Sequence, residues 1–161
     1  MNDPNDQSAV CYTFEAAIEM AVKMEEEGFR HYLEALRLVK NKHAREILKD
    51  AALDELKHKM ELEKALIEGT IEGKHALDRP VQTMNLDYVL KTEKLKPDAG
   101  VREALAYAIH LEKGSLDFYH RMAEGCAGAP MAAVFERIGN DEGGHLKSLE
   151  DLYEEHFLTE N

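Results

Sequence analysis

The chain has 161 residues, which is enough for one domain with a sizeable core. Its 32 acidic residues against 20 lysines and arginines give a formal net charge of −12, which disfavours nucleic acid and anionic membrane surfaces as partners. Cys11 and Cys126 lie far apart and outside any Cys-x-x-Cys pattern, so we expect ordinary thiols and neither a zinc ribbon nor a disulfide framework.

Residues 1–12 read as a loose polar tail. The opening residues are polar and acidic, whereas a signal peptide would be basic and then apolar. No run approaches the roughly 18 apolar residues of a membrane span. We therefore expect a soluble, cytoplasmic protein with one domain over residues 13–158 and no membrane contact.

Apolar residues at helical spacing predict four helices, at about residues 13–40, 43–68, 99–124 and 130–157. The short loop near Asn41 predicts that the first two helices are antiparallel neighbours. Asp98 is the expected N-cap of the third helix, and Pro130 suits the first turn of the fourth. The intervening segment, about 70–97, is richer in helix breakers, so we expect a crossover with a short helix near 85–92.

Four residue identities recur at a fixed offset of 87 positions: Glu25, Tyr32, Glu55 and His58 reappear as Glu112, Tyr119, Glu142 and His145. A Glu-x-x-His pattern alone is weak evidence, because Glu72 and His75 also form one among helix breakers. The Glu-x6-Tyr pattern, however, occurs only twice, each time 30 residues ahead of a Glu-x-x-His in a predicted helix. This indicates an internal duplication, in which two similar hairpins build one site.

Glutamate and histidine three residues apart lie on one helix face, so each Glu-x-x-His can present an oxygen and a nitrogen to the same volume. Two such pairs and two single glutamates make six candidate metal ligands: Glu25, Glu55, His58, Glu112, Glu142 and His145. Four carboxylates and two imidazoles suit a pair of irons, with manganese as the alternative, and the absence of thiolate ligands argues against structural zinc.

The competing interpretation is that these glutamates are buried carboxyls that share protons by hydrogen bonding. Simple solvation does not suit them, because each interrupts a predicted apolar stripe, where an unpaired carboxylate is costly. Tyr32 and Tyr119 lie two turns beyond the single glutamates, where a phenol can orient a ligating carboxylate; the alternative is an ordinary core tyrosine. Gly143 and Gly144, between two candidate ligands, suit a bulge or substrate access; close helix packing or mere sequence drift explains them equally well.

The segments MEEEGFRHY and LEKGSLDFY resemble the first and third helices of small rubrerythrin-like proteins, and LDELKHK and NDEGGHLK resemble the second and fourth. Over about residues 13–157 the chain therefore resembles the rubrerythrin branch of the ferritin-like superfamily. The resemblance implies an all-α, up-down-down-up four-helix bundle made of two duplicated hairpins, with a long crossover between the second and third helices.

By the same resemblance, Glu55 and Glu142 would bridge two irons, Glu25 and Glu112 would be terminal carboxylates, and His58 and His145 would each cap one iron. Two features depart from the family pattern. The chain lacks the four cysteine ligands of a rubredoxin module, so electrons are expected from a separate donor protein such as a rubredoxin. Ile109 stands where the family carries an extra glutamate that lets one iron move during peroxide reduction, so the resemblance does not extend to that step.

The leading functional hypothesis is a di-iron oxidoreductase that oxidises ferrous iron with hydrogen peroxide or oxygen and so lowers oxidative stress, acting as a homodimer. A second hypothesis is a ferroxidase that stores iron in a ferritin-type assembly. A third is a metal-stabilised bundle without turnover.

Overall fold

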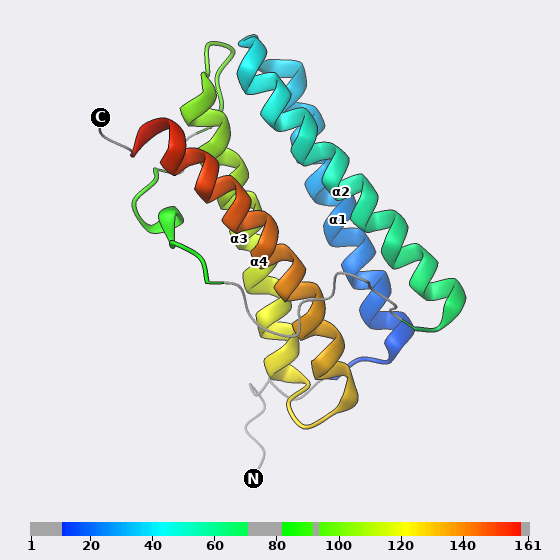
Figure 1. The fold of residues 1–161 in the computed structure, drawn as a ribbon. Helices are drawn as coiled ribbons and strands as arrows, with labels where there is room; N and C mark the ends of the chain where they lie inside the picture. The colour runs from blue at the N-terminus through cyan, green and yellow to red at the C-terminus, as the bar shows by residue number, and fades with distance from the viewer. Residues whose placement is uncertain (1–10, 71–81, 92–93, 159–161) are drawn as a thin grey trace.

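The computed structural model describes residues 11–70, 82–91 and 94–158. Within these ranges the helices are α1 (Phe14–Leu38), α2 (Lys42–Glu68), the short 3-10 helix η2 (Leu86–Tyr88), α3 (Val101–Gly125) and α4 (Pro130–Phe157). Helices α1 and α2 pack as one antiparallel hairpin beside a second hairpin of α3 and α4, and the four run up, down, down and up (Figure 1). The predicted bundle of two hairpins with a crossover between them is confirmed.

The ends of the first hairpin follow local sequence signals. The Thr13 side chain accepts a hydrogen bond from the Ala16 N–H at 3.3 Å, and the Asn41 side chain accepts one from the Ala44 N–H at 3.0 Å. Both satisfy backbone donors that the first helical turn leaves unpaired. Helix α2 ends where Gly69 adopts the left-handed conformation at φ 72°, which glycine tolerates best.

The start of α3 differs from the prediction. The N-cap is Gly100 and not Asp98, and the Glu103 carboxylate accepts the Gly100 N–H at 3.0 Å. The start of α3 is thus closed by the side chain of Glu103, the third residue of the helix, and not by an aspartate at the cap. Pro130 occupies the first turn of α4, as predicted.

The crossover contains less helix than expected, since η2 covers only three residues of the predicted 85–92. A buried side chain of α4 holds it in place instead: the Glu150 carboxylate accepts the N–H groups of Met84 and Leu86, each at 2.9 Å. Sequence reasoning did not single out Glu150, which is fully buried. Residues 71–81, which include Glu72 and His75, and residues 92–93 lie outside the described ranges.

The core consists of apolar clusters above and below a polar middle layer. Along α1, Ala17, Ile18 and Ala21 belong to one cluster and Ala35 and Val39 to another, and Glu25 lies between them. The other three helices likewise place a glutamate in this layer, so the bundle seals four carboxylates from bulk water with apolar side chains at both ends.

The expectation of free thiols is wrong, because Cys11 and Cys126 form a disulfide with a Cα–Cα distance of 4.7 Å. The two residues are 115 positions apart in sequence. The bundle nevertheless brings the start of α1 to the end of α3, within the distance a disulfide requires. Spacing along the chain carried no signal of this meeting.

None of the described helices combines the length and the apolar character that crossing a membrane requires.

Candidate metal centre

Each helix contributes to one buried site at mid-height of the bundle. Glu25 comes from α1, Glu55 and His58 from α2, Glu112 from α3, and Glu142 and His145 from α4. The four glutamates are only 2–4% exposed, whereas the side chains of His58 and His145 are 16% and 32% exposed. The carboxylates therefore lie inside the bundle, and the imidazoles lie between them and solvent.

The two histidines connect the hairpins. His58 Nδ1 lies 3.5 Å from Glu25 Oε2 and 3.8 Å from Glu142 Oε1, and His145 Nδ1 lies 4.0 Å from Glu142 Oε2. Their rings stack with centroids 4.2 Å apart. The buried carboxylates of Glu25 and Glu142 are thus in ion-pair contact with histidine.

Two sets of three side chains bring potential ligand atoms within 4.8 Å of one another. One set is Glu25, Glu55 and His58, and the other is His58, Glu142 and His145. Five of the six predicted ligands therefore converge as the sequence suggested. Glu112 belongs to neither set, although it is buried at the same level, and its Oε1 accepts a hydrogen bond from Tyr32 at 3.0 Å.

Unpaired polar atoms concentrate at this site. Among the described residues, the buried atoms without a hydrogen-bond partner include Glu25 Oε2, Glu112 Oε2, Glu142 Oε2, His58 Nδ1 and His145 Nδ1. Each buried polar atom left unpaired costs about 1–3 kcal/mol. Oxygen and nitrogen lone pairs gathered without donors are the arrangement that a pair of transition-metal cations satisfies, so these residues fit such a group.

The metal-free site must divide protons among its acids. Burial and nearby carboxylates raise the pKa of Glu55 and of Glu142. Burial also opposes ionisation of Glu25, but its close contacts with His58, Glu55 and Glu142 lower its pKa to about 2. The pKa of His58 is raised, because its contact with Glu25 outweighs burial, while burial and the neighbouring His58 lower the pKa of His145. Glu25 thus favours its charged form, whereas Glu55 and Glu142 favour their neutral, protonated forms.

The two tyrosines contact the single glutamates across the hairpins. Tyr32 of α1 donates to Glu112 Oε1 of α3 at 3.0 Å, and Tyr119 of α3 donates to Glu25 Oε1 of α1 at 3.4 Å. Their hydroxyls also approach the carbonyl oxygens of Ala108 and Ala21, at 3.4 and 3.5 Å. The sequence placed each phenol beside a ligating carboxylate but could not show that the carboxylate belongs to the opposite hairpin.

Small residues make room for the site on α1. A Cβ added to Gly28 would lie 3.0–3.3 Å from the Glu55 carboxylate group, closer than ordinary contact. In α4, the helix continues through Gly143 and Gly144 without interruption, so no bulge is present there.

Ile109 is fully buried in an apolar cluster with Leu105 and Leu146, and it brings no carboxylate to the centre.

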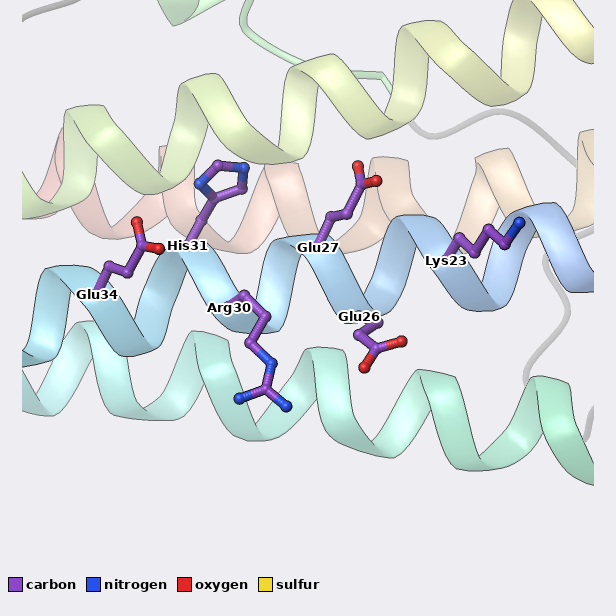
Figure 2. Close-up of a pocket in the computed structure, with 6 residues that line it drawn as sticks. All are labelled: Lys23, Glu26, Glu27, Arg30, His31 and Glu34. Carbon is purple, nitrogen blue, oxygen red and sulfur yellow. The ribbon is translucent and has the colours of Figure 1, made fainter.

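A surface hollow of about 340 Å³ on the outer side of α1 is separate from this centre. Figure 2 shows Glu27, His31 and Glu34 pointing toward α3, while Glu26 and Arg30 point toward α2. None of the six predicted ligands lines it.

Comparison with known proteins gives one informative match. No curated protein and no solved structure matches the chain. The family model described as rubrerythrin matches residues 16–153, a range that begins and ends within α1 and α4 and includes every predicted ligand. Together with the all-helical bundle of two hairpins, this match establishes that the chain belongs to the rubrerythrin family.

Proposed function

We propose that this protein is a di-iron oxidoreductase that reduces hydrogen peroxide or oxygen at the expense of ferrous iron. The observation that carries the proposal is the set of buried, unpaired carboxylate and imidazole atoms that converge from four helices. Bound there, two irons would supply the electrons that the oxidant takes up. Manganese is the alternative metal.

In this proposal Glu25, Glu55, Glu112 and Glu142 neutralise the metal charge, and His58 and His145 favour a transition metal over magnesium or calcium. Tyr32 and Tyr119 orient two of the carboxylates through their hydroxyl groups. The apolar clusters at both ends of the bundle exclude water. The partly exposed imidazoles mark the side between α2 and α4 as the route by which a small oxidant reaches the centre.

The reductant is proposed to be a separate protein such as a rubredoxin. The support is the sequence itself, because both cysteines of the chain are joined to each other and none is available as an iron ligand. Sustained turnover should therefore need an added electron donor, whereas a single turnover of iron-loaded protein should not.

Stopped-flow mixing of the anaerobic ferrous-loaded protein with peroxide or with oxygen tests the proposal. We expect rapid oxidation of about two irons per chain, and no comparable phase in Glu142→Ala. Full iron occupancy without reaction toward either oxidant would leave a metal-stabilised bundle. Uptake of many irons per chain into a large assembly would instead establish storage.

We also propose a homodimer formed through α2. Four apolar side chains lie on the outer side of this helix, with exposures of 51%, 41%, 68% and 87%: Leu53, Leu56, Met60 and Ile67. If two copies cross antiparallel at Met60, Leu53 of each copy meets Ile67 of the other, because both are seven residues from the centre. Light scattering should give twice the 18.2 kDa chain mass, and the chain mass alone for Met60→Glu but not for Tyr88→Glu.

We infer that residues 13–158 form one folding unit, since either hairpin alone would expose the middle carboxylates and the apolar clusters.

A cytoplasmic location stays a prediction. The Cys11–Cys126 disulfide argues against it, because disulfides are rare in that compartment. Cell fractionation followed by immunoblotting tests the location.

A further inference from the structure

The largest of the three described hollows lies away from the metal centre, where residues 89–91 and 94–99 of the crossover border α3. Its volume is about 860 Å³, near the upper end of the range for small-molecule sites, and the other two are smaller, at about 340 and 350 Å³. Tyr153 of α4 completes the wall. The function proposed above makes no use of this space.

The hollow is cationic in an acidic protein. Four basic side chains line it: Lys91, Lys94, Lys96 and Arg102. Among the described residues, two carboxylates join them, Asp98 and Glu103, and the Glu103 carboxylate already accepts the Gly100 N–H. In a chain of net charge −12, this concentration of positive charge draws small anions to one place.

The inner wall is apolar. Leu95 and Ala99 are buried members of the core that also border the hollow, and the rings of Tyr107 and Tyr153 lie beside them. A simple inorganic anion would leave most of this surface without a partner. A ligand that satisfies both wall and rim carries an aromatic or aliphatic body and a negatively charged group.

Hydrogen bonds fix the walls before any ligand arrives. His110 Nε2 lies 3.0 Å from the Leu90 carbonyl oxygen, and the Lys40 N–H donates to the Pro97 carbonyl at 3.1 Å. The Arg102 guanidinium stands over the Phe157 ring at 4.5 Å, which positions its charge at the rim. A preformed site of this kind loses little conformational freedom on binding.

One wall residue also reaches toward the metal centre. The Tyr107 ring meets the Tyr32 ring edge to face at 6.2 Å, and Tyr32 donates to Glu112. A molecule in the hollow therefore lies one aromatic pair away from a predicted metal ligand.

We propose that this hollow is a binding site for a small organic anion with an apolar body. The inference goes beyond the proposed redox function and does not depend on it, because it rests on the crossover and α3 and not on the metal ligands.

The test uses 8-anilinonaphthalene-1-sulfonate as the probe and the full chain, with fluorescence titration as the readout. The double variant Lys96→Glu/Arg102→Glu should weaken probe binding at least about tenfold, which is the loss expected from two charge contacts. The new glutamate at position 102 lies in the first turn of α3, where a negative charge favours the helix, so folding should be retained. Ala106→Trp, which fills the hollow and leaves its charge unchanged, should also abolish binding.

The control is Lys49→Glu/Lys57→Glu, which makes the same change in net charge on α2 and alters a smaller basic hollow lined by Lys49. It should leave the affinity within about twofold, since global charge alone acts weakly at physiological salt. Equal loss in the control, or undiminished binding in Ala106→Trp, would overturn the proposal. Naphthalene-2-sulfonate should displace the probe more readily than naphthalene or sulfate does. If naphthalene or sulfate displaces it equally well, the proposal is overturned, because the site would then recognise the apolar body alone or the negative charge alone.

Discussion

The two hairpins are alike where they face the centre and unlike where they face outward. Tyr32 with Ala108 repeats as Tyr119 with Ala21, each pair related by the offset of 87 residues. On the outer side the same offset relates Glu63, which is exposed on α2, to Glu150, which is fully buried on α4. The described part of the crossover around η2 packs on α3 and is bonded to α4, so equivalent residues of the two hairpins meet different surroundings. The two hairpins are thus alike at the six predicted ligands and differ where the described part of the crossover packs on the second hairpin.

The same comparison explains the bare apolar stripe of α2. The positions equivalent to Leu53, Leu56, Met60 and Ile67 in α4 are Asn140, Gly143, Lys147 and Glu154. Helix α4 therefore does not repeat the stripe. An apolar side chain exposed on one hairpin only is better explained by a partner surface than by the duplication.

The largest expected effect comes from removing one of the duplicated glutamates that face the centre of the bundle. Glu55→Ala or Glu142→Ala deletes a carboxylate that the resemblance assigns to both metals, so bound iron should fall from about two per chain to one or none. The rise in melting temperature on metal loading should fall with it, because bound metal stabilises the folded state. Metal analysis and calorimetry after anaerobic loading measure both. Glu63→Ala serves as the control and should change neither; equal loss there would show that the wrong carboxylates were assigned.

The second-largest effect should come from the buried Glu150 of α4, whose removal should lower the free energy of unfolding much more than removal of the equivalent Glu63 of α2. Glu150→Ala leaves the buried N–H groups of Met84 and Leu86 without an acceptor, and we expect a loss of about 3 kcal/mol in the free energy of unfolding. Glu63→Ala, at the equivalent position of α2, should change it by less than about 0.5 kcal/mol. Urea unfolding of the two variants provides the comparison. Similar losses would mean that the crossover is not anchored through Glu150.

The proton distribution of the metal-free site predicts a pH dependence. The pKa values of Glu55 and Glu142 are raised above the ordinary 4.5, so the folded chain holds protons that the unfolded chain has lost. Unfolding then releases protons, and the free energy of unfolding should fall as the pH rises above about 4.5. The pKa of Glu25, about 2, adds no slope in this range, because both states are ionised there.

We therefore expect the metal-free protein to lose about 1.4 kcal/mol per pH unit for each of these two protons between about pH 5.5 and 8. Metal binding must displace the same protons, so loading in weak buffer should acidify the solution. Glu142→Gln should reduce both the slope and the proton release. A metal-free stability that rises with pH across this range would contradict the assignment of protons to Glu55 and Glu142.

A smaller asymmetry lies beside the ligands. Gly28 of α1 corresponds to Ser115 of α3, and only the glycine is shown to lie against a ligand carboxylate. Gly28→Ala should therefore weaken metal binding about tenfold by displacing the Glu55 carboxylate, although alanine raises helix propensity by about 1 kcal/mol. Ser115→Ala should leave affinity unchanged. Competition titration with a metal chelator distinguishes these outcomes, and an unaffected Gly28→Ala would mean that Glu55 shifts without loss.

The sequence predicted most of the helices and the residues of the middle layer because both depend on local spacing. Helical periodicity puts Glu55 and His58 on one face, and the short loop near Asn41 makes their helix the antiparallel neighbour of the helix that carries Glu25, so the convergence of these three residues was foreseeable. The cross-hairpin bonds of the tyrosines, the Cys11–Cys126 pairing and the burial of Glu150 depend on how distant elements meet. No spacing within one helix encodes such meetings. The metal assignment itself stays a prediction until loading is measured.

The smallest effect concerns the two tyrosines, which the duplication makes equivalent but the distances do not. The Tyr32 bond to Glu112 is 3.0 Å and the Tyr119 bond to Glu25 is 3.4 Å, near the limit for a hydrogen bond. Tyr32→Phe should therefore destabilise the metal-free protein by about 1 kcal/mol and Tyr119→Phe by about half as much. Thermal unfolding of both single variants and of the double variant measures this. Equal losses that disappear after metal loading would indicate that the difference in distance belongs to the metal-free side chains alone, and that metal binding makes the two hairpins equivalent.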